Sequence, residues 1–140
     1  MDLTIIIPCK NEEKYIGNLL HSLSLQEGIS NIMIIIADAG STDNTIQIIE
    51  SFSNLNIQII KGGLPAIGRN KGAELANTKY LLFIDADVEI YQEDLITKSV
   101  SKMDKFDLYL LTGKLNSKNL IAKILYSITN LLISISKFDK

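Results

Sequence analysis

The run Leu3-Thr4-Ile5-Ile6-Ile7-Pro8 (residues 3–8) is apolar at almost every position and rich in β-branched side chains. Further apolar runs, rich in isoleucine and leucine, follow at 32–37, 57–60, 80–84 and 108–111. Runs that stay apolar, instead of alternating with polar residues, are typical of strands covered on both faces of a parallel sheet. Because helical patterns separate the runs, we predict an α/β fold in which helices flank a mainly parallel sheet.

The first predicted helix lies directly after the run 3–8. Asn11 is suited to cap a helix N-terminus, and Glu12 and Glu13 would place negative charge in the first turn, where the helix dipole favours it. We therefore expect this helix to begin after Asn11. In a later helix, Gly68 and Gly72 are expected to permit close backbone packing. The other predicted helices span about 43–52, 65–76 and 92–103.

The composition is that of a folded globular chain with one domain. Of the 140 residues, 46% are hydrophobic and 21% are charged, which excludes a disordered or a disulfide-built protein. Fourteen basic and sixteen acidic residues give a net charge of −2, so nucleic acid is not expected as a partner. Cys9 is the only cysteine, and the chain begins with a strand pattern instead of a secretory signal. We therefore expect a cytoplasmic protein.

The segment 119–136 has an apolar stripe at helical spacing and is predicted to form an amphipathic helix. A membrane-spanning helix is disfavoured, because the segment is short and is interrupted by polar residues. Two interpretations stay open. The helix packs on the sheet or on a partner chain, such as a second copy of this one, or it lies on a membrane surface, at the inner face of the membrane.

Polar loops follow three of the predicted strands, at residues 8–13, 38–43 and 85–87. In an open parallel sheet, ligands bind outside the carboxyl ends of the strands. The three loops are therefore expected to meet at one edge of the sheet, where a functional site would lie.

Asp85 and Asp87 follow the strand 80–84 and are separated by one residue. An extended backbone would point both carboxylates the same way, and Mg²⁺ and Mn²⁺ prefer oxygen ligands of this kind. A solvated turn is the alternative interpretation. The position directly after a buried strand favours a cation site, because two like charges there are costly without a cation or another partner.

Asp38 and Arg69 are two further candidates. Asp38 is predicted either to form a turn or a cap at the start of the second helix or to accept a hydrogen bond from a nucleobase, and we favour the nucleobase. For Thr42 and Asp43, in the same loop, we favour helix capping. Arg69 is the only arginine, and it is predicted to form either a surface ion pair or a bridge between a phosphate and a carboxylate.

Four motifs stand in a fixed order along the chain: Pro8-Cys9-Lys10-Asn11-Glu12-Glu13, Asp38-Ala39-Gly40-Ser41-Thr42-Asp43, Gly68-Arg69-Asn70-Lys71-Gly72 and Asp85-Ala86-Asp87. Together they resemble the motifs of the GT-A fold glycosyltransferases of family 2, over about residues 3–112. The resemblance implies a hexosyltransferase-like enzyme that uses Mg²⁺ or Mn²⁺ and a nucleotide sugar, with a UDP-sugar favoured over a GDP-sugar. The acceptor would be a saccharide or a lipid-linked molecule. Transfer would invert the sugar, with a carboxylate base taking the proton of the attacking acceptor hydroxyl.

The resemblance also implies roles for individual residues. The first loop would surround the nucleotide, with Asp38 against the base and Arg69 near the diphosphate. Asp85 and Asp87 match the DxD signature of the family, in which the first acid lies near the ribose or the metal and the last binds the metal. The expected donor-binding residues are Pro8, Cys9, Asn11, Glu12, Asp38, Gly40, Arg69 and Asp85, and the expected metal ligands are Asp87 and Asp85.

Two departures from the family pattern concern the ribose and the acceptor. Ala39 stands where the family commonly has a second acid, which would alter ribose contacts or base preference. Residues 1–112 are expected to form the Rossmann-like GT-A nucleotide-sugar-binding core, followed in 113–140 by the C-terminal helix or the start of an acceptor region, where no residue is assigned as the catalytic base. A non-catalytic nucleotide-sugar-binding or assembly module therefore stays open as an alternative. A nucleotidyltransferase or an NAD-dependent dehydrogenase is disfavoured, because the loop 8–13 contains no glycine.

Overall fold

The structure is a computed structural model, and it describes residues 1–106. By its internal contacts the chain divides into two units, residues 1–101 and 102–140, and the fold described below is that of the first unit. The elements in chain order are β1 (Leu3–Cys9), α1 (Ile16–Ser24), a 3₁₀ helix η1 (Ile29–Asn31), β2 (Met33–Asp38), α2 (Thr45–Glu50), β3 (Ile57–Lys61), α3 (Pro65–Leu75), β4 (Tyr80–Phe83) and α4 (Leu95–Phe106). Three predictions lie outside the described residues: the strand 108–111, the domain boundary at 112 and the helix 119–136.

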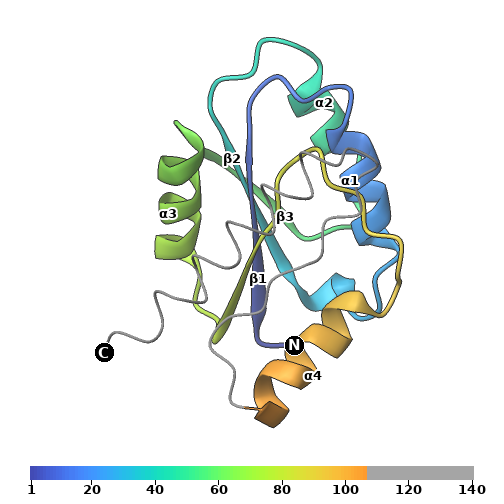
Figure 1. Cartoon of the computed structure of the whole chain (residues 1–140). Helices are drawn as coiled ribbons and strands as arrows, with labels where there is room; N and C mark the ends of the chain where they lie inside the picture. Colours follow the sequence, from blue (N-terminus) through green and yellow to red (C-terminus); the bar gives the residue numbers. More distant parts are fainter. Residues whose placement is uncertain (107–140) are drawn as a thin grey trace, which may run out of the picture. The chain divides into compact units, whose positions relative to one another are not determined.

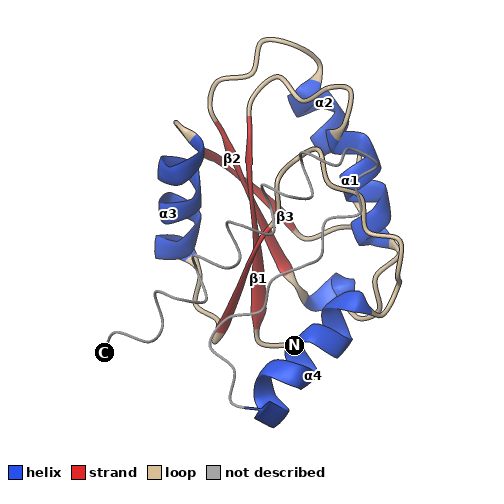
Figure 2. Ribbon diagram, viewed as in Figure 1, coloured by secondary structure: helices blue, strands red, loops and turns tan. Residues whose placement is uncertain are grey.

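Four parallel strands form one sheet in the order β3-β2-β1-β4 (Figure 1). Helices α1 and α2 lie on one face of the sheet and α3 lies on the other (Figure 2). The predicted α/β fold with a parallel sheet is therefore confirmed, and each strand begins and ends within one residue of its predicted run. None of the helices among residues 1–106 is long and apolar enough to cross a membrane.

The hydrophobic core lies between the sheet and α1. Ile5 pairs with Ile34 and Ile7 pairs with Ile36 in adjacent strands, and all four side chains are fully buried. Buried leucines of α1 belong to the same cluster. Burial of each such side chain contributes about 1.5–3 kcal/mol, so this layer is a main source of stability. It also holds the ends of β1 and β2 in fixed positions.

The start of α1 differs from the prediction. Asn11 does not cap the helix, which begins only at Ile16 and has no side-chain cap. Instead, Asn11 has a left-handed backbone with φ of 55°, and its Oδ1 accepts the backbone N–H of Thr42 at 2.8 Å. The prediction was wrong because a tertiary contact with the loop after β2 replaces the local cap.

Helix α3 packs closely on the sheet through its two buried glycines. A Cβ atom on Gly72 would lie 2.5 Å from Cγ2 of Ile6, and one on Gly68 would lie 3.2 Å from Cβ of Ala37. No Cβ atom fits at the first distance without movement of the helix or the strand. The close backbone packing predicted for these glycines is therefore confirmed.

We predict that Gly72→Ala destabilises the fold. The added methyl group would collide with Ile6, and such overpacking costs about 1–3 kcal/mol, which exceeds the roughly 1 kcal/mol that alanine gains over glycine inside a helix. Urea denaturation should show a lower unfolding midpoint for this variant.

The matched control is Gly17→Ala in α1, where the new Cβ would meet Cγ2 of Ile48 at 3.5 Å, an ordinary contact distance. This variant should be as stable as the parent or more stable, by up to about 1 kcal/mol. An unchanged midpoint for Gly72→Ala would show that α3 can move away from β1 without cost.

Candidate functional site

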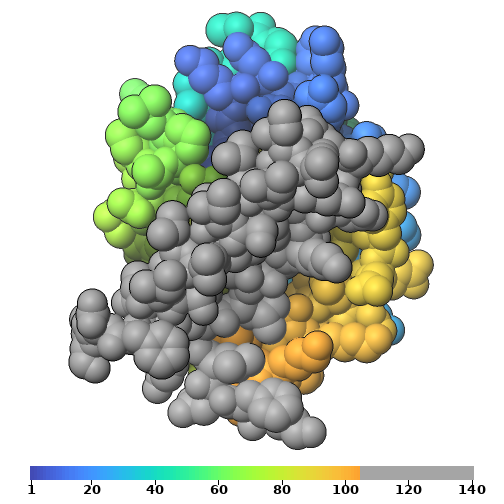
Figure 3. Space-filling model, in the orientation of Figure 1, coloured from blue at the N-terminus to red at the C-terminus, as the bar shows by residue number. Residues whose placement is uncertain are grey.

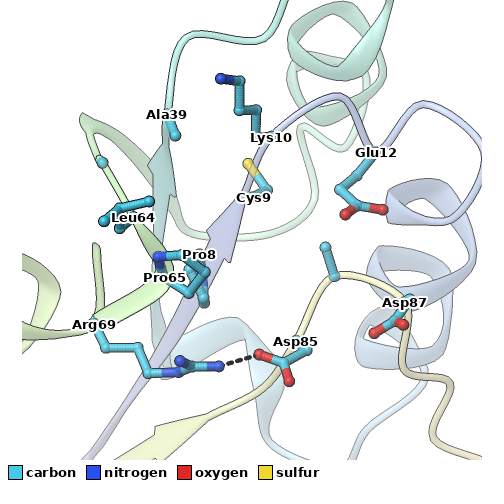
Figure 4. Close-up of a pocket in the computed structure, with 12 residues that line it drawn as sticks. Pro8, Cys9, Lys10, Glu12, Ala39, Leu64, Pro65, Arg69, Asp85 and Asp87 are labelled. Atoms are coloured by element: carbon cyan, nitrogen blue, oxygen red, sulfur yellow. Dashed lines mark hydrogen bonds and ion pairs between the residues drawn. The ribbon is translucent and has the colours of Figure 1, made fainter. Parts of the chain in front are cut away.

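A cavity of about 620 Å³ lies at the carboxyl ends of the strands, and Figure 4 shows the side chains around it. Every strand of the sheet leads into a segment that lines it. The lining residues are Pro8, Cys9, Lys10, Glu12, Ala39, Gly63, Leu64, Pro65, Arg69, Asp85, Ala86 and Asp87. The sequence prediction that the polar loops meet at one edge of the sheet is therefore confirmed.

The loops after β1 and β2 are joined by hydrogen bonds, and Figure 3 shows the dark blue and cyan atoms of these parts of the chain in contact. Three successive backbone N–H groups of the first loop donate to side chains of the second loop and of the start of α2: Asn11 to Ser41 Oγ at 2.8 Å, Glu12 to Thr45 Oγ1 at 2.8 Å and Glu13 to Asp43 Oδ2 at 3.2 Å. Because these bonds lock the two loops together, they form one rigid rim of the cavity.

Asp38 organises the second loop. Its Oδ2 accepts the backbone N–H of Gly40 at 2.9 Å, and its Oδ1 accepts the hydroxyl of Ser41 at 2.5 Å. Partial burial opposes ionisation of this carboxyl, but the hydrogen bonds from Ser41 and Gly40 outweigh that effect, and the pKa of Asp38 is lowered. Asp38 thus forms a turn, which was one of its two predicted roles. The other predicted role, a contact with a nucleobase, remains a prediction.

Helix capping was predicted for Thr42 and Asp43. Asp43 satisfies a backbone N–H at the start of α2, whereas the Thr42 hydroxyl donates to Asn11 Oδ1 at 3.5 Å. Asp43 Oδ1 accepts the backbone N–H of Thr45, at the start of α2, at 3.0 Å, and the hydroxyl of Thr45 at 2.5 Å. These bonds also point Thr45 Oγ1 toward the first loop, where it accepts the N–H of Glu12. Asp43 therefore stabilises both the helix start and the joined rim.

Cys9 is buried at the end of β1, and its Sγ lies 3.7 Å from Oδ1 of Asp38. Burial, followed by the charge and hydrogen bond of Asp38, raises the pKa of the Cys9 thiol to about 12. The thiol therefore stays protonated at neutral pH and lines the cavity as a neutral group. A thiol in this state is neither a nucleophile nor a metal ligand, since both roles need the thiolate.

An extended backbone was predicted for the two acids after β4. The structure has a turn there instead. The strand ends at Phe83, and the backbone N–H of Val88 donates to the carbonyl of Asp85 at 3.2 Å, which closes a turn around Asp87. Because of this turn, the two carboxylates have different surroundings. Arg69 Nη2 donates to Asp85 Oδ1, so the surface ion pair that was one interpretation of Arg69 is present (Figure 4).

The carboxylates around the cavity fit a hard divalent cation. Partial burial and then the negative charges of Asp87, Asp43 and Asp85 raise the pKa of Glu12. No three His, Cys, Asp or Glu side chains among residues 1–106 form a complete cluster for a metal. Carboxylate oxygens are ligands that Mg²⁺ prefers, and in proteins one or two of them commonly hold this ion together with substrate phosphates.

The predicted site residues divide into two groups. Six of them line the cavity, namely Pro8, Cys9, Glu12, Arg69, Asp85 and Asp87. Asn11, Asp38 and Gly40 do not line it and instead hold the rim together.

The segment after β3 supplies Gly63, Leu64 and Pro65 to the cavity and was not predicted from the sequence. The sequence did contain a sign of this segment's role, because the segment directly follows an apolar run, as the other three loops do. Gly62 brings it against β2, since a Cβ there would lie 2.5 Å from the carbonyl oxygen of Ala37. Lys71 Nζ donates to the carbonyl oxygens of Lys61 and Gly62 at 3.1 and 3.2 Å and fixes the same segment.

Comparisons with known proteins agree with this geometry. The pattern of the family described as Glycosyl transferase family 2 matches residues 4–127. Poly(ribitol-phosphate) beta-N-acetylglucosaminyltransferase TarS of Staphylococcus aureus is 36% identical over 101 residues, which cover 68% of this chain and 18% of the relative. The 4,4'-diaponeurosporenoate glycosyltransferase of S. aureus is 32% identical over 105 residues, which cover 71% of this chain and 28% of the relative. The chain thus spans less than a third of the length of these relatives.

Solved structures show the same fold. S. aureus TarS 1–349 in complex with UDP-GlcNAc superposes with a TM-score of 0.73 at 28% identity, over 86% of this chain and 37% of that one. The mannosyltransferase PcManGT from Pyrobaculum calidifontis, in complex with GDP-Man and Mn²⁺, gives a TM-score of 0.65 at 21% identity, over 73% of this chain and 32% of that one, which supports the fold alone. From its sequence pattern, its sheet and these relatives, the chain belongs to glycosyltransferase family 2 and has the GT-A fold.

Proposed function

We propose that this chain is the donor-binding part of a glycosyltransferase that takes its sugar from a nucleotide sugar, with a UDP-sugar favoured. The observation that carries the proposal is the cavity at the strand ends, which is lined by Arg69, by the acids after β4 and by residues of the first loop. The similarity to TarS, whose structure was solved with UDP-GlcNAc, supports the choice of donor. A saccharide or a lipid-linked molecule is the proposed acceptor, and a cytoplasmic location is part of the same proposal.

The cavity offers different surroundings to the two ends of such a donor. Neutral and apolar groups line one part of it, from Pro8 and Cys9 across Ala39 to Leu64 and Pro65. We assign the nucleoside to this part, since a base and a ribose tolerate apolar walls with a few polar contacts. The diphosphate would lie against Arg69, because a guanidinium offers several N–H donors in a plane that suits phosphate oxygens.

Mg²⁺ or Mn²⁺ would be held by Asp87, with Asp85 as the second candidate from the sequence analysis. When bound, such an ion supplies Lewis-acid stabilisation of the charge on the departing nucleoside diphosphate. The acceptor hydroxyl would attack the sugar from the opposite side, giving inversion, while a carboxylate base takes its proton. The residues of the chain described above bind and orient the donor.

We predict that Asp87→Ala removes the gain in UDP affinity that Mn²⁺ gives to the parent chain. Loss of a carboxylate that holds the ion should lower the affinity measured with Mn²⁺ by about tenfold or more, and it should leave binding in EDTA much less affected. Isothermal calorimetry with UDP, in Mn²⁺ and in EDTA, measures both quantities.

Glu74→Ala is the matched control, because Glu74 is an exposed acid of α3 that does not line the cavity. It should keep the full gain from Mn²⁺. The proposal fails if the parent chain binds no nucleoside diphosphate, or if Asp87→Ala and Glu74→Ala behave alike.

We further predict that Arg69→Met weakens UDP binding but not uridine binding. A charged hydrogen bond contributes about 1.5–3 kcal/mol, which corresponds to a loss of roughly 10- to 100-fold in affinity. Uridine lacks the phosphates and should keep its affinity. Competition binding with both compounds measures the difference, and Lys14→Met, at an exposed lysine outside the cavity, is the charge control. An equal loss for uridine and UDP would remove Arg69 from the diphosphate.

A further inference from the structure

Two buried polar side chains lie at the end of α1, a helix whose other buried side chains are isoleucine or leucine. Ser22 is 5% exposed, and Gln26, two residues after the helix, is 3% exposed. Neither side chain lines the cavity. Because a buried polar group costs free energy unless it forms hydrogen bonds, the partners of these two side chains indicate what they do. We call Ser22 and Gln26 the α1 polar pair.

The partners of the α1 polar pair are backbone groups that follow β4 in the sequence. Ser22 Oγ accepts the N–H of Ile90 at 3.1 Å. Gln26 Nε2 donates to the carbonyl oxygen of Gln92 at 2.7 Å, and its Oε1 accepts the N–H of Ile96 at 3.3 Å. Figure 1 shows this part of the chain, in yellow, passing α1 on its way to α4. The α1 polar pair therefore holds the connection between β4 and α4 at three backbone groups.

The connection, residues 84–94, contains no helix or strand of its own, so its path depends on contacts with other elements. At its start, Ile84 donates its N–H to the carbonyl oxygen of Ile6 at 3.1 Å, and the side chains of Ile84 and Ala86 are buried. Asp87 follows in an exposed turn. Asp87 thus lies between this first anchor and the second anchor that the α1 polar pair provides.

We propose that Ser22 and Gln26 are positioning residues, which act through the backbone of the connection on the place of Asp87 in the cavity. This inference rests on the proposed function, because it concerns how the chain holds its cation-binding turn. Groups that bind a ligand or an ion must be held within about 0.5 Å of their productive position. Apolar side chains at positions 22 and 26 could fill the same space, but the hydrophobic effect has no direction. Hydrogen bonds fix both a distance and a direction, and the α1 polar pair forms them with backbone close to Asp87.

The test uses Gln26→Met, which keeps the length of the side chain and removes both of its hydrogen bonds. The measured quantity is the gain from Mn²⁺, defined as the ratio of the UDP dissociation constants in EDTA and in Mn²⁺. Loss of a group that touches a metal ligand directly lowers metal affinity by about 10- to 100-fold, and Gln26 acts only through the backbone. We therefore expect the gain to fall by roughly three- to tenfold, while UDP affinity in EDTA stays within about twofold of the parent.

Thr4→Val is the matched control. Thr4 is 1% exposed, and its Oγ1 forms a hydrogen bond with Oγ1 of Thr78 at 2.8 Å. It lies near the start of β1, at the opposite end of the strand from the cavity. This variant also loses a buried hydrogen bond, yet it should keep the full gain from Mn²⁺. Equal loss of the gain in Thr4→Val and Gln26→Met would reveal a general effect of lower stability and would overturn the inference.

Ser22→Ala is the second variant, to be used also if Gln26→Met does not fold, because it removes one small group and the hydrogen bond to Ile90. It should lower the gain by about threefold. Hydrogen exchange followed by mass spectrometry should show faster exchange in residues 88–96 but not in the first loop.

The inference is overturned if a folded variant of Ser22 or Gln26 keeps the gain of the parent, whether or not residues 88–96 exchange faster. It is also overturned if UDP affinity falls equally in EDTA and in Mn²⁺, because the effect would then not concern the cation. Failure of the proposed function is a different result, in which the parent chain itself shows no UDP binding or no gain from Mn²⁺.

Discussion

The parallel pairing of β1 on both of its edges is the constraint on which the rest of the structure depends. Every residue of β1 is buried, and the strand pairs with β2 on one side and β4 on the other. Parallel pairing brings all four strands to their carboxyl ends on the same side, so the polar residues that follow them gather at one edge. The last pair in the register joins Cys9 to Asp38, which sets the loops after β1 and β2 side by side. The position of the cavity is thus a consequence of strand direction.

The sheet could be predicted from the sequence because burial on both faces requires nearly every residue of a strand to be apolar. The start of α1 could not, and Asn11 shows why. Its side chain is a good local cap, but the backbone N–H of Thr42, 31 residues further on, binds it instead. Asp43, by contrast, caps α2 through Thr45, two residues away, and local reasoning identified it. Local propensity predicted the contacts that stay within one turn and missed those that join separate loops.

Prediction of the site from the sequence has the same limit, because contacts between separate elements leave no local pattern. The acids after β4 and Arg69 were found because each lies in a recognisable motif, but the pairing of Arg69 with Asp85 joins different elements and has no sequence signal. The segment 63–65 was missed because it carries no charged group. Its place in the cavity depends on the close approach of Gly62 to Ala37 and on the lysine bonds to its carbonyl groups, which are visible only in three dimensions.

The charges that line the cavity explain why binding of the donor would depend on a cation. The lining includes three carboxylates, of Glu12, Asp85 and Asp87, and two cationic side chains, of Lys10 and Arg69, so its formal charge is −1. Cys9 adds nothing, because its pKa of about 12 keeps it neutral. A diphosphate adds further negative charge, and like charges close together in a partly enclosed cavity repel one another. With Arg69 already bound to Asp85, Lys10 is the other cationic side chain of the lining that a lone diphosphate could meet. A divalent cation beside Asp87 would remove that repulsion, which is the physical reason for proposing that donor and cation bind together.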